Sequence, residues 1–269
     1  MEWKNILRGI AMGTSDLIPG VSGGTIAVIL GIYDRLIEAI SGLFSRHWKK
    51  HVAFLIPLGI GMAAAILGLS RLIEFLLLEY YAPTQFFFIG LILGIIPLLM
   101  FEFKSRATMR PVHIVAMVIG AILVASMAII KPADTAIITE LSTGTALLLF
   151  FSGWLGSMAM LLPGISGSFV LLLIGVYPTV ISALSNLNVL IIGIVGLGVA
   201  VGFIVSSKVI RYLLGNFPGM TFSVILGLVI GSLAVVFPGL PETATMWVLS
   251  VVSFVAGFLI VRLLGRFSV

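Results

Sequence analysis

The feature that most limits the fold of this chain is the length of its uncharged stretches. From Leu141 to Ser207 the chain runs for 67 residues without Asp, Glu, Lys or Arg. Several shorter uncharged runs reach the roughly 20 residues that a membrane-spanning helix needs. Only 9% of the 269 residues are charged, against about 25% in soluble domains, and the mean hydropathy is +1.27. The sequence therefore predicts an all-α, polytopic membrane protein.

Composition also argues against several other classes of protein. The chain has no cysteine, so it has no disulfide framework and no thiolate chemistry. The net charge of +5 comes from basic residues in short loops between apolar runs, which is not the pattern of a nucleic-acid-binding protein. No group of metal ligands and no pair of base and nucleophile is visible in the sequence. We therefore expect neither a catalytic site nor a metal or cofactor, and we expect membrane lipids around the chain.

An internal repeat organises the sequence into two halves. Ile18–Leu43 aligns with Leu162–Leu187 at a shift of 144, and 10 of these 26 positions are identical. The identities include Pro, Gly, Ser and Tyr, which match by chance far less readily than Leu or Ile. The match continues downstream at a shift of 137. We interpret residues 1–269 as one membrane domain with repeats at 1–131 and 141–266 and a short outer connector at 131–141.

Each half is predicted to contain a broken helical hairpin followed by three membrane spans. The expected hairpins are Asn5–Phe44 and Ser142–Leu187. The short arms of the first hairpin favour a re-entrant loop, because about 12 residues cross only half of a 30 Å core. The second hairpin has enough apolar residues before its break for a full span, so both forms stay open there. The expected spans are Val52–Leu78, Thr84–Phe103, Pro111–Ile130, Val189–Leu214, Met220–Phe237 and Thr245–Leu264.

The two halves are predicted to have opposite orientations. A hairpin returns to the side from which it started, so each half crosses the membrane an odd number of times. With both termini inside, 12 of the 15 basic residues lie on the cytoplasmic side, as the positive-inside rule requires. These 12 are Lys4, Arg8, Arg46, Lys49, Lys50, Lys104, Arg106, Arg110, Lys208, Arg211, Arg262 and Arg266.

The two breaks have a sequence that suits an anion site. "IPGVSGGT" (Ile18–Thr25) and "LPGISGS" (Leu162–Ser168) both place Pro-Gly before a Ser-Gly pair. Proline ends the incoming helix and glycine permits a tight turn, while serine or threonine can cap the outgoing helix. A turn at membrane depth survives only if it is buried or lines a wet cavity. The helix N-termini that begin there attract anions, phosphate above all.

We therefore predict that the two tips bind an anionic substrate, chiefly through backbone N–H groups. A single Pro-Gly kink would more often be structural, but two copies on opposite sides favour a site. The candidate residues are Gly20, Ser22, Gly23, Gly24 and Thr25 in the first tip and Gly164, Ser166, Gly167 and Ser168 in the second.

Charged residues near the membrane interior supply further candidates. Asp16 precedes the first break, and its counterpart is Met160; Asp16 is either an ion-coupling group or a structural cap. Arg71 is predicted on the outer side, where it would attract phosphate or pair with Glu74. Its counterpart Lys208 is more readily explained as a snorkelling cytoplasmic residue. Arg35 is predicted to form a local ion-pair cluster with its neighbours Asp34 and Glu38.

The segments Asp16–Thr25 and Ile29–Ile40 resemble the PopT-type polyprenyl-phosphate translocase family, and the resemblance extends over essentially the whole chain. The second tip fits less closely, because Ser168 and Phe169 replace Gly-Thr. The resemblance implies a transporter in the bacterial cytoplasmic membrane that returns undecaprenyl phosphate, the lipid carrier of wall and surface glycans, to the cytoplasmic leaflet. The residues alone indicate an anionic substrate; that it is a lipid follows only from the resemblance.

Three functions are compatible with the sequence. The preferred one is a flippase-type transporter of undecaprenyl phosphate with ion-coupled alternating access. The second is a channel or transporter for an anion or small solute that uses the same half-helix site. The third, a lipid-modifying enzyme, lacks visible catalytic groups. A lateral opening to the tips would favour the first function, and a continuous aqueous pore the second.

Overall fold

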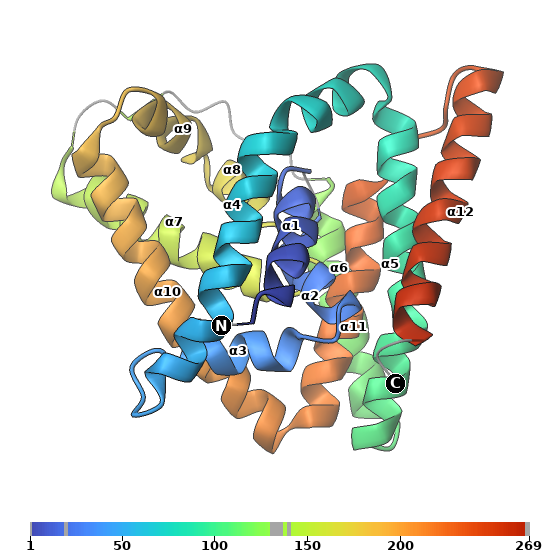
Figure 1. Ribbon diagram of the computed structural model, residues 1–269, viewed down its shortest axis with the longest axis horizontal. Helices are drawn as coiled ribbons and strands as arrows, with labels where there is room; N and C mark the ends of the chain where they lie inside the picture. The colour runs from blue at the N-terminus through green and yellow to red at the C-terminus, as the bar shows by residue number, and fades with distance from the viewer. Residues whose placement is uncertain (1, 19–20, 130–136, 139–140, 267–269) are drawn as a thin grey trace.

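The computed structural model describes residues 2–18, 21–129, 137–138 and 141–266 as an all-helical protein (Figure 1). No strand occurs in these ranges, which confirms the predicted all-α class. The helices are α1 (Lys4–Asp16), α2 (Gly23–Ile29), α3 (Tyr33–Ser41), α4 (Trp48–Glu79), α5 (Tyr81–Arg106), α6 (Pro111–Met127), α7 (Thr143–Leu161), α8 (Gly167–Ile174), α9 (Tyr177–Ser185), α10 (Val189–Asn216), α11 (Pro218–Val236) and α12 (Ala244–Arg266).

Most of the predicted membrane spans are present as long apolar helices. Within the described residues, six helices are long and apolar enough to cross a membrane, namely α4, α5, α7, α10, α11 and α12. The bent pair α8–α9 would make a seventh if it counts as one span. α6 has 17 residues and is therefore shorter than the predicted span, whose last residue lies outside the described ranges. The result is a polytopic membrane protein.

The helices pack mainly in four pairs. α1 lies along α4 in the centre of Figure 1, and α7 lies along α10 at the left. α5 lies along α12 at the right, and α6 packs against α11. α5 also contacts α11, which joins the two halves of the chain. Every pair thus combines an apolar helix with a neighbour that covers one of its faces.

Glycines set the close approach within two of these pairs. A Cβ at Gly90 of α5 would lie 2.2 Å from the carbonyl oxygen of Phe254 in α12. A Cβ at Gly227 of α11 would lie 2.1 Å from the carbonyl oxygen of Met117 in α6. Only glycine allows backbones to approach so closely, a common device between membrane helices. The two contacts correspond to each other in the repeat. Gly90 and Gly227 are 137 positions apart, and so are Met117 and Phe254.

The outgoing arms of both broken hairpins are shorter than the expected 12 residues. α2 has 7 residues and α8 has 8, so each is only about 10–12 Å long. Gly31 and Gly175 end these arms with φ of 65° and 85°, a left-handed conformation that favours glycine. The chain then turns into α3 and α9; α8 and α9 meet at 111°.

The incoming arms differ in length. α1 has 13 residues, or about 20 Å, and does not reach across a 30 Å core. α7 has 19 residues, or about 28 Å, which is long enough for a span. The two hairpins therefore have similar outgoing arms but differ in the length of the incoming helix.

Candidate functional site

The two broken-hairpin tips contact each other inside the protein. Ser22 Oγ donates a hydrogen bond to the carbonyl oxygen of Leu162 at 3.3 Å. The Gly164 N–H donates to Thr25 Oγ1 at 2.9 Å. Ser22, Thr25 and Ser166 are all buried. The structure thus brings together most of the backbone turns that the sequence marked as a site, although they lie about 140 residues apart in the chain.

In the first tip, the N–H groups of Gly23, Gly24 and Thr25 all have hydrogen-bond partners. The Gly23 N–H donates to the Asp16 carboxylate at 2.7 Å, and the Gly24 N–H donates to Ser22 Oγ at 3.1 Å. The Thr25 N–H donates to the backbone oxygen of Ser22. Ser22 is therefore the N-cap of α2, as predicted, and Asp16 places a carboxylate where the sequence predicted an anion.

The second tip is arranged differently at the equivalent position. A Cβ at Gly167 would lie 2.5 Å from Met160 Cγ, just as one at Gly23 would lie 2.9 Å from the carboxylate oxygens of Asp16. The Gly167 and Ser168 N–H groups donate to no acceptor among the described residues. Ser166 Oγ hydrogen-bonds Ser168 Oγ at 2.9 Å instead of capping α8. A thioether therefore occupies the second tip where a carboxylate occupies the first.

Two predicted site residues need a separate account. Gly20 lies, with Pro19, outside the described residues. Arg71 is exposed on α4, and within the described chain no ion pair joins it to Glu74. Its counterpart Lys208 is exposed on α10. The part of the chain that the structure describes thus provides no ion pair for Arg71 and no hydrogen bond from it to a tip.

An apolar cavity of about 470 Å³ begins beside the first tip. Thr14 and Ile18 form its wall on the hairpin side, and Thr84 is one of its few polar residues. The rest of the lining comes from α4, α5 and α12 and the turn between α4 and α5, through Ile73, Leu76, Tyr80, Pro83, Phe87, Phe88, Leu249 and Ser253. Such a lining suits a hydrocarbon chain rather than a hydrated ion.

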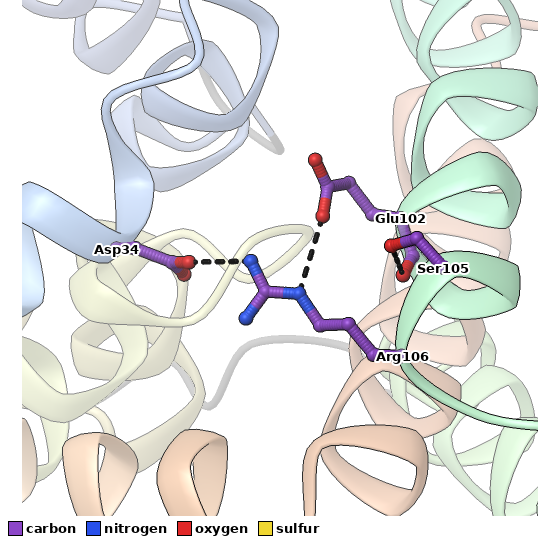
Figure 2. A network of polar contacts seen from close by, with 4 residues as sticks. All are labelled: Asp34, Glu102, Ser105 and Arg106. Atoms are coloured by element: carbon purple, nitrogen blue, oxygen red, sulfur yellow. Dashed lines mark hydrogen bonds and ion pairs between the residues drawn. The ribbon is translucent and has the colours of Figure 1, made fainter.

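A second cavity, of about 300 Å³, lies at the other end of α5 and contains charged groups. Figure 2 shows Arg106 reaching from α5 toward Asp34 of α3, with Glu102 on the same side as Arg106. Arg106 Nη2 bonds Asp34 Oδ2 at 2.8 Å, and Nε bonds Glu102 Oε2 at 3.3 Å. The guanidinium also lies 5.0 Å from the centre of the Phe222 ring.

The predicted cluster of Arg35 with Asp34 and Glu38 is wrong. Arg35 pairs with Glu2 and lies 4.8 Å from the ring centre of Phe54, while Asp34 pairs with Arg106. Consecutive residues of a helix point about 100° apart, so Asp34 and Arg35 face different neighbours.

Sequence reasoning missed two groups at these sites. The Tyr33 hydroxyl donates to the carbonyl oxygen of Leu161 at 3.0 Å and so ties the first hairpin to the second tip. The match of Tyr33 with Tyr177 in the repeat was a signal for it. Arg106 was assigned only to a cytoplasmic loop, although Glu102 four residues earlier is typical of an ion pair on a helix.

Comparisons with a family model and with individual proteins agree on one family. A family model described as undecaprenyl phosphate translocase-like matches residues 12–255. A polyprenyl-phosphate transporter of Staphylococcus aureus is 46% identical over 99% of this chain and 97% of its own. A polyprenyl-phosphate transporter of Vibrio cholerae is 35% identical over 86% of this chain and 76% of its own. No solved structure matches.

Proposed function

Because this chain belongs to the undecaprenyl phosphate translocase-like family, a family of transporters and not of enzymes, we propose that it returns undecaprenyl phosphate from the outer to the cytoplasmic leaflet of the bacterial cytoplasmic membrane. The observation that carries the proposal is the near full-length similarity to a polyprenyl-phosphate transporter. The geometry supports the proposal as well. The contact between the two tips is polar and could bind a phosphate, and the apolar cavity beside it has space for a lipid chain.

The proposed mechanism uses two inverted repeats related by a two-fold axis in the membrane plane. The helix pairing supports this, because α1–α4 corresponds to α7–α10, and α5–α12 corresponds to α11–α6. Because a two-fold axis exchanges the halves, the pair of α5 with α12 implies the reciprocal pair of α11 with α6, and both pairs occur. The reciprocal glycine contacts of α5–α12 and α6–α11 support the same axis. α3 and α9 lie toward opposite ends of the bundle in Figure 1, in agreement with inversion.

Both termini are proposed to be cytoplasmic. α5 ends with Lys104 and Arg106 in its last turn, and the loop that follows carries Arg110. Together with the distribution of the other basic residues, this favours the cytoplasm for this end of α5. The cavity lined by Thr14 and Thr84 then faces the outer leaflet, and the cavity with Arg106 faces the cytoplasm.

The phosphate is proposed to bind between the tips. Gly167 and Ser168 offer N–H groups that have no acceptor among the described residues, and Gly23 offers one that Asp16 now holds. Protonation of Asp16, or capture of a cation by it, would weaken this hydrogen bond and release the Gly23 N–H for the phosphate. Asp16 would in this way couple substrate binding to an ion, and the side chains of Ser22, Thr25 and Ser166 would complete the site.

The polyprenyl chain is proposed to lie in the apolar cavity and the surrounding lipid while the phosphate reaches the tips. Arg71, exposed on the outer part of α4, would draw phosphate head groups toward this cavity. A lipid with a charged head needs both features, because its tail is more stable in hydrocarbon and its head in a polar site.

A channel or transporter for an anion or small solute is the alternative. The two cavities share no lining residue, which favours alternating access over a continuous pore. The apolar lining of the outer cavity also favours a lipid over a hydrated ion.

The proposal is tested with purified protein in vesicles that contain undecaprenyl phosphate labelled in one leaflet. We expect the protein to accelerate movement of the lipid to the other leaflet and not to transport inorganic phosphate. Movement of inorganic phosphate without movement of the lipid would favour the alternative function.

A further inference from the structure

We propose that the cavity around Arg106 is a docking site for a phosphate monoester attached to a hydrocarbon chain, in which the phosphate takes Arg106 from Asp34. The inference rests on the proposed function and adds a second substrate site, at the far end of α5 from the outer cavity. Three observations carry it: the chemistry of the cavity, the way Arg106 is held, and the exposure of its ion pair.

The cavity has one charged end and otherwise apolar walls. Arg106, Asp34 and Glu102 lie together at the charged end. The remaining lining is Val28, Gly31, Tyr33, Leu98, Phe101, Phe222 and Ile225. A free phosphate ion would leave these apolar walls without a partner, whereas a lipid phosphate would use both parts of the cavity.

Arg106 is the group in this cavity suited to bind phosphate. A guanidinium presents five donors in a planar fork that matches phosphate oxygens in a bidentate arrangement. In the structure its Nη2 and Nε are bound by Asp34 and Glu102. These two carboxylates give the charged end an excess of negative charge, so a phosphate can bind there only if one of them gives up Arg106.

Asp34 is the carboxylate that can give way. Its side chain is 51% exposed and comes from α3, whereas Glu102 is four residues away on the helix of Arg106. Exposed ion pairs contribute little to stability, and water readily replaces them. Without Asp34, the Phe222 ring and Glu102 still hold the guanidinium in place. Separation of Asp34 from Arg106 would also free α3, which follows directly from the first broken hairpin.

The chain offers a matched control on α3, the helix that carries Asp34. Arg35 also forms an exposed ion pair and lies over an aromatic ring, with Glu2 and Phe54 as its partners. It lines neither of the two cavities described above. Arg35→Gln therefore removes an equivalent contact without changing the proposed site.

The test uses a thiol reporter inside the cavity, since the natural chain has no cysteine. Leu98→Cys, introduced into the full chain in lipid nanodiscs, gives a cavity residue whose rate of alkylation falls when the cavity is occupied. The probe is farnesyl phosphate, with farnesol as a control for the chain and inorganic phosphate as a control for the head group. We expect farnesyl phosphate to protect the thiol, and farnesol and inorganic phosphate to protect it much less.

The decisive measurement is whether two substitutions that break the same ion pair raise or lower the half-protecting concentration of farnesyl phosphate. Arg106→Gln should raise the half-protecting concentration of farnesyl phosphate about tenfold, the effect of losing a charge-assisted hydrogen bond. Asp34→Asn should lower it by up to about fivefold, because Arg106 is freed and a negative charge is removed. Arg106→Lys should lie between wild type and Arg106→Gln, and Arg35→Gln should match wild type.

Other outcomes overturn the inference in distinguishable ways. If the ion pair is only a structural clamp, Arg106→Gln and Asp34→Asn will change protection in the same direction. Equal protection by inorganic phosphate would make the cavity a site for the free ion. If wild-type protein moves undecaprenyl phosphate in vesicles but farnesyl phosphate does not protect the thiol, this site is wrong and the proposed function stands. If the wild-type protein neither moves the lipid nor responds to farnesyl phosphate, both fail.

Discussion

The two broken hairpins have nearly the same turn sequence but opposite chemistry at the start of the outgoing helix. In the first, the Asp16 carboxylate accepts a hydrogen bond from the Gly23 N–H. In the second, the Met160 side chain lies against Gly167, and the neighbouring N–H groups have no acceptor among the described residues. The two tips thus have similar backbones, but the Asp16 side chain holds an N–H group of the first, whereas the Met160 side chain packs against the second without accepting a hydrogen bond.

This difference suggests a division of labour between the tips. In the proposed mechanism, the second tip would bind the phosphate through N–H groups that have no acceptor among the described residues, whereas the first would exchange Asp16 for it. A symmetric backbone that binds the substrate asymmetrically would allow one tip to hold the phosphate and the other to sense an ion.

Gly167→Ala should have the largest effect. Its Cβ would lie 2.5 Å from the carbonyl oxygen of Gly156, and this backbone atom cannot move without separating α7 from α8. Overpacking of this kind costs about 1–3 kcal/mol. We expect loss of transport in vesicles together with a lower melting temperature in detergent. Wild-type stability and transport would show that α8 does not pack tightly on α7.

Gly23→Ala, the matched change in the first tip, should abolish or strongly reduce transport without unfolding the protein. The nearest atoms to its Cβ would be the two carboxylate oxygens of Asp16, both at 2.9 Å, and this flexible side chain can move away. We expect transport to fall about tenfold or more, as after loss of a hydrogen bond to a charged group. An equal loss of stability for both alanine variants would contradict the difference between the tips.

Asp16→Asn should separate transport from its driving ion. The amide oxygen can still accept the Gly23 hydrogen bond, but the side chain no longer binds a proton or cation. We expect residual transport that no longer responds to an imposed ion gradient, measured in vesicles with and without the gradient. Met160→Leu in the other tip should leave the response intact. A response that persists in Asp16→Asn would assign coupling to another residue.

Arg71→Ala should reduce the rate of transport from the outer side moderately, by about fivefold at low salt, and leave stability unchanged. The reason is loss of electrostatic attraction for the phosphate, which salt screens. Arg71→Lys should retain part of the rate, and Lys208→Ala should have no effect from this side. Equal rates for wild type and Arg71→Ala at low salt would remove Arg71 from the substrate path.

Ser22→Ala and Ser166→Ala should have the smallest effects, and these effects should differ. Ser22 caps α2 and also bonds Leu162, so its loss should lower the free energy of unfolding by about 1 kcal/mol. Among the described residues the Ser166 hydroxyl bonds only the hydroxyl of Ser168, so its loss should matter less. Both variants should transport measurably. Complete loss of transport in either folded variant would mean that hydroxyl groups, not the backbone, make the site.

Much of the fold could be predicted because apolar runs, and the residues that end helices, can be read directly from the order of residues in the chain. The predicted span Val189–Leu214 became α10 at Val189–Asn216, and Met220–Phe237 became α11 at Pro218–Val236. Apolar length fixes such helices in a membrane, where every backbone group must be bonded internally. The breaks at Gly31 and Gly175 were less evident, because a glycine inside an apolar run does not by itself indicate a turn. Their positive φ angles are known only from the structure.

The candidate site could be predicted only in part. The repeated Pro-Gly-x-Ser-Gly turn identified the residues, and its polarity identified an anion as the expected ligand. The sequence did not show that Asp16 already occupies the first tip, because that depends on how α1 packs against α2. It also misassigned Asp34, whose partner Arg106 lies 72 residues away.

The sequence by itself thus determined the class of protein, the helices and the repeated turn, since each depends on neighbours along the chain. Tertiary structure decided what those turns contact: Leu162 for Ser22, Thr25 for Gly164 and Asp34 for Arg106. Such contacts depend on how the helices pack, and in a membrane that packing depends on small residues and single hydrogen bonds rather than on a hydrophobic pattern. Apolar surface is equally stable against lipid or protein, so hydropathy selects the helices but leaves their partners undetermined.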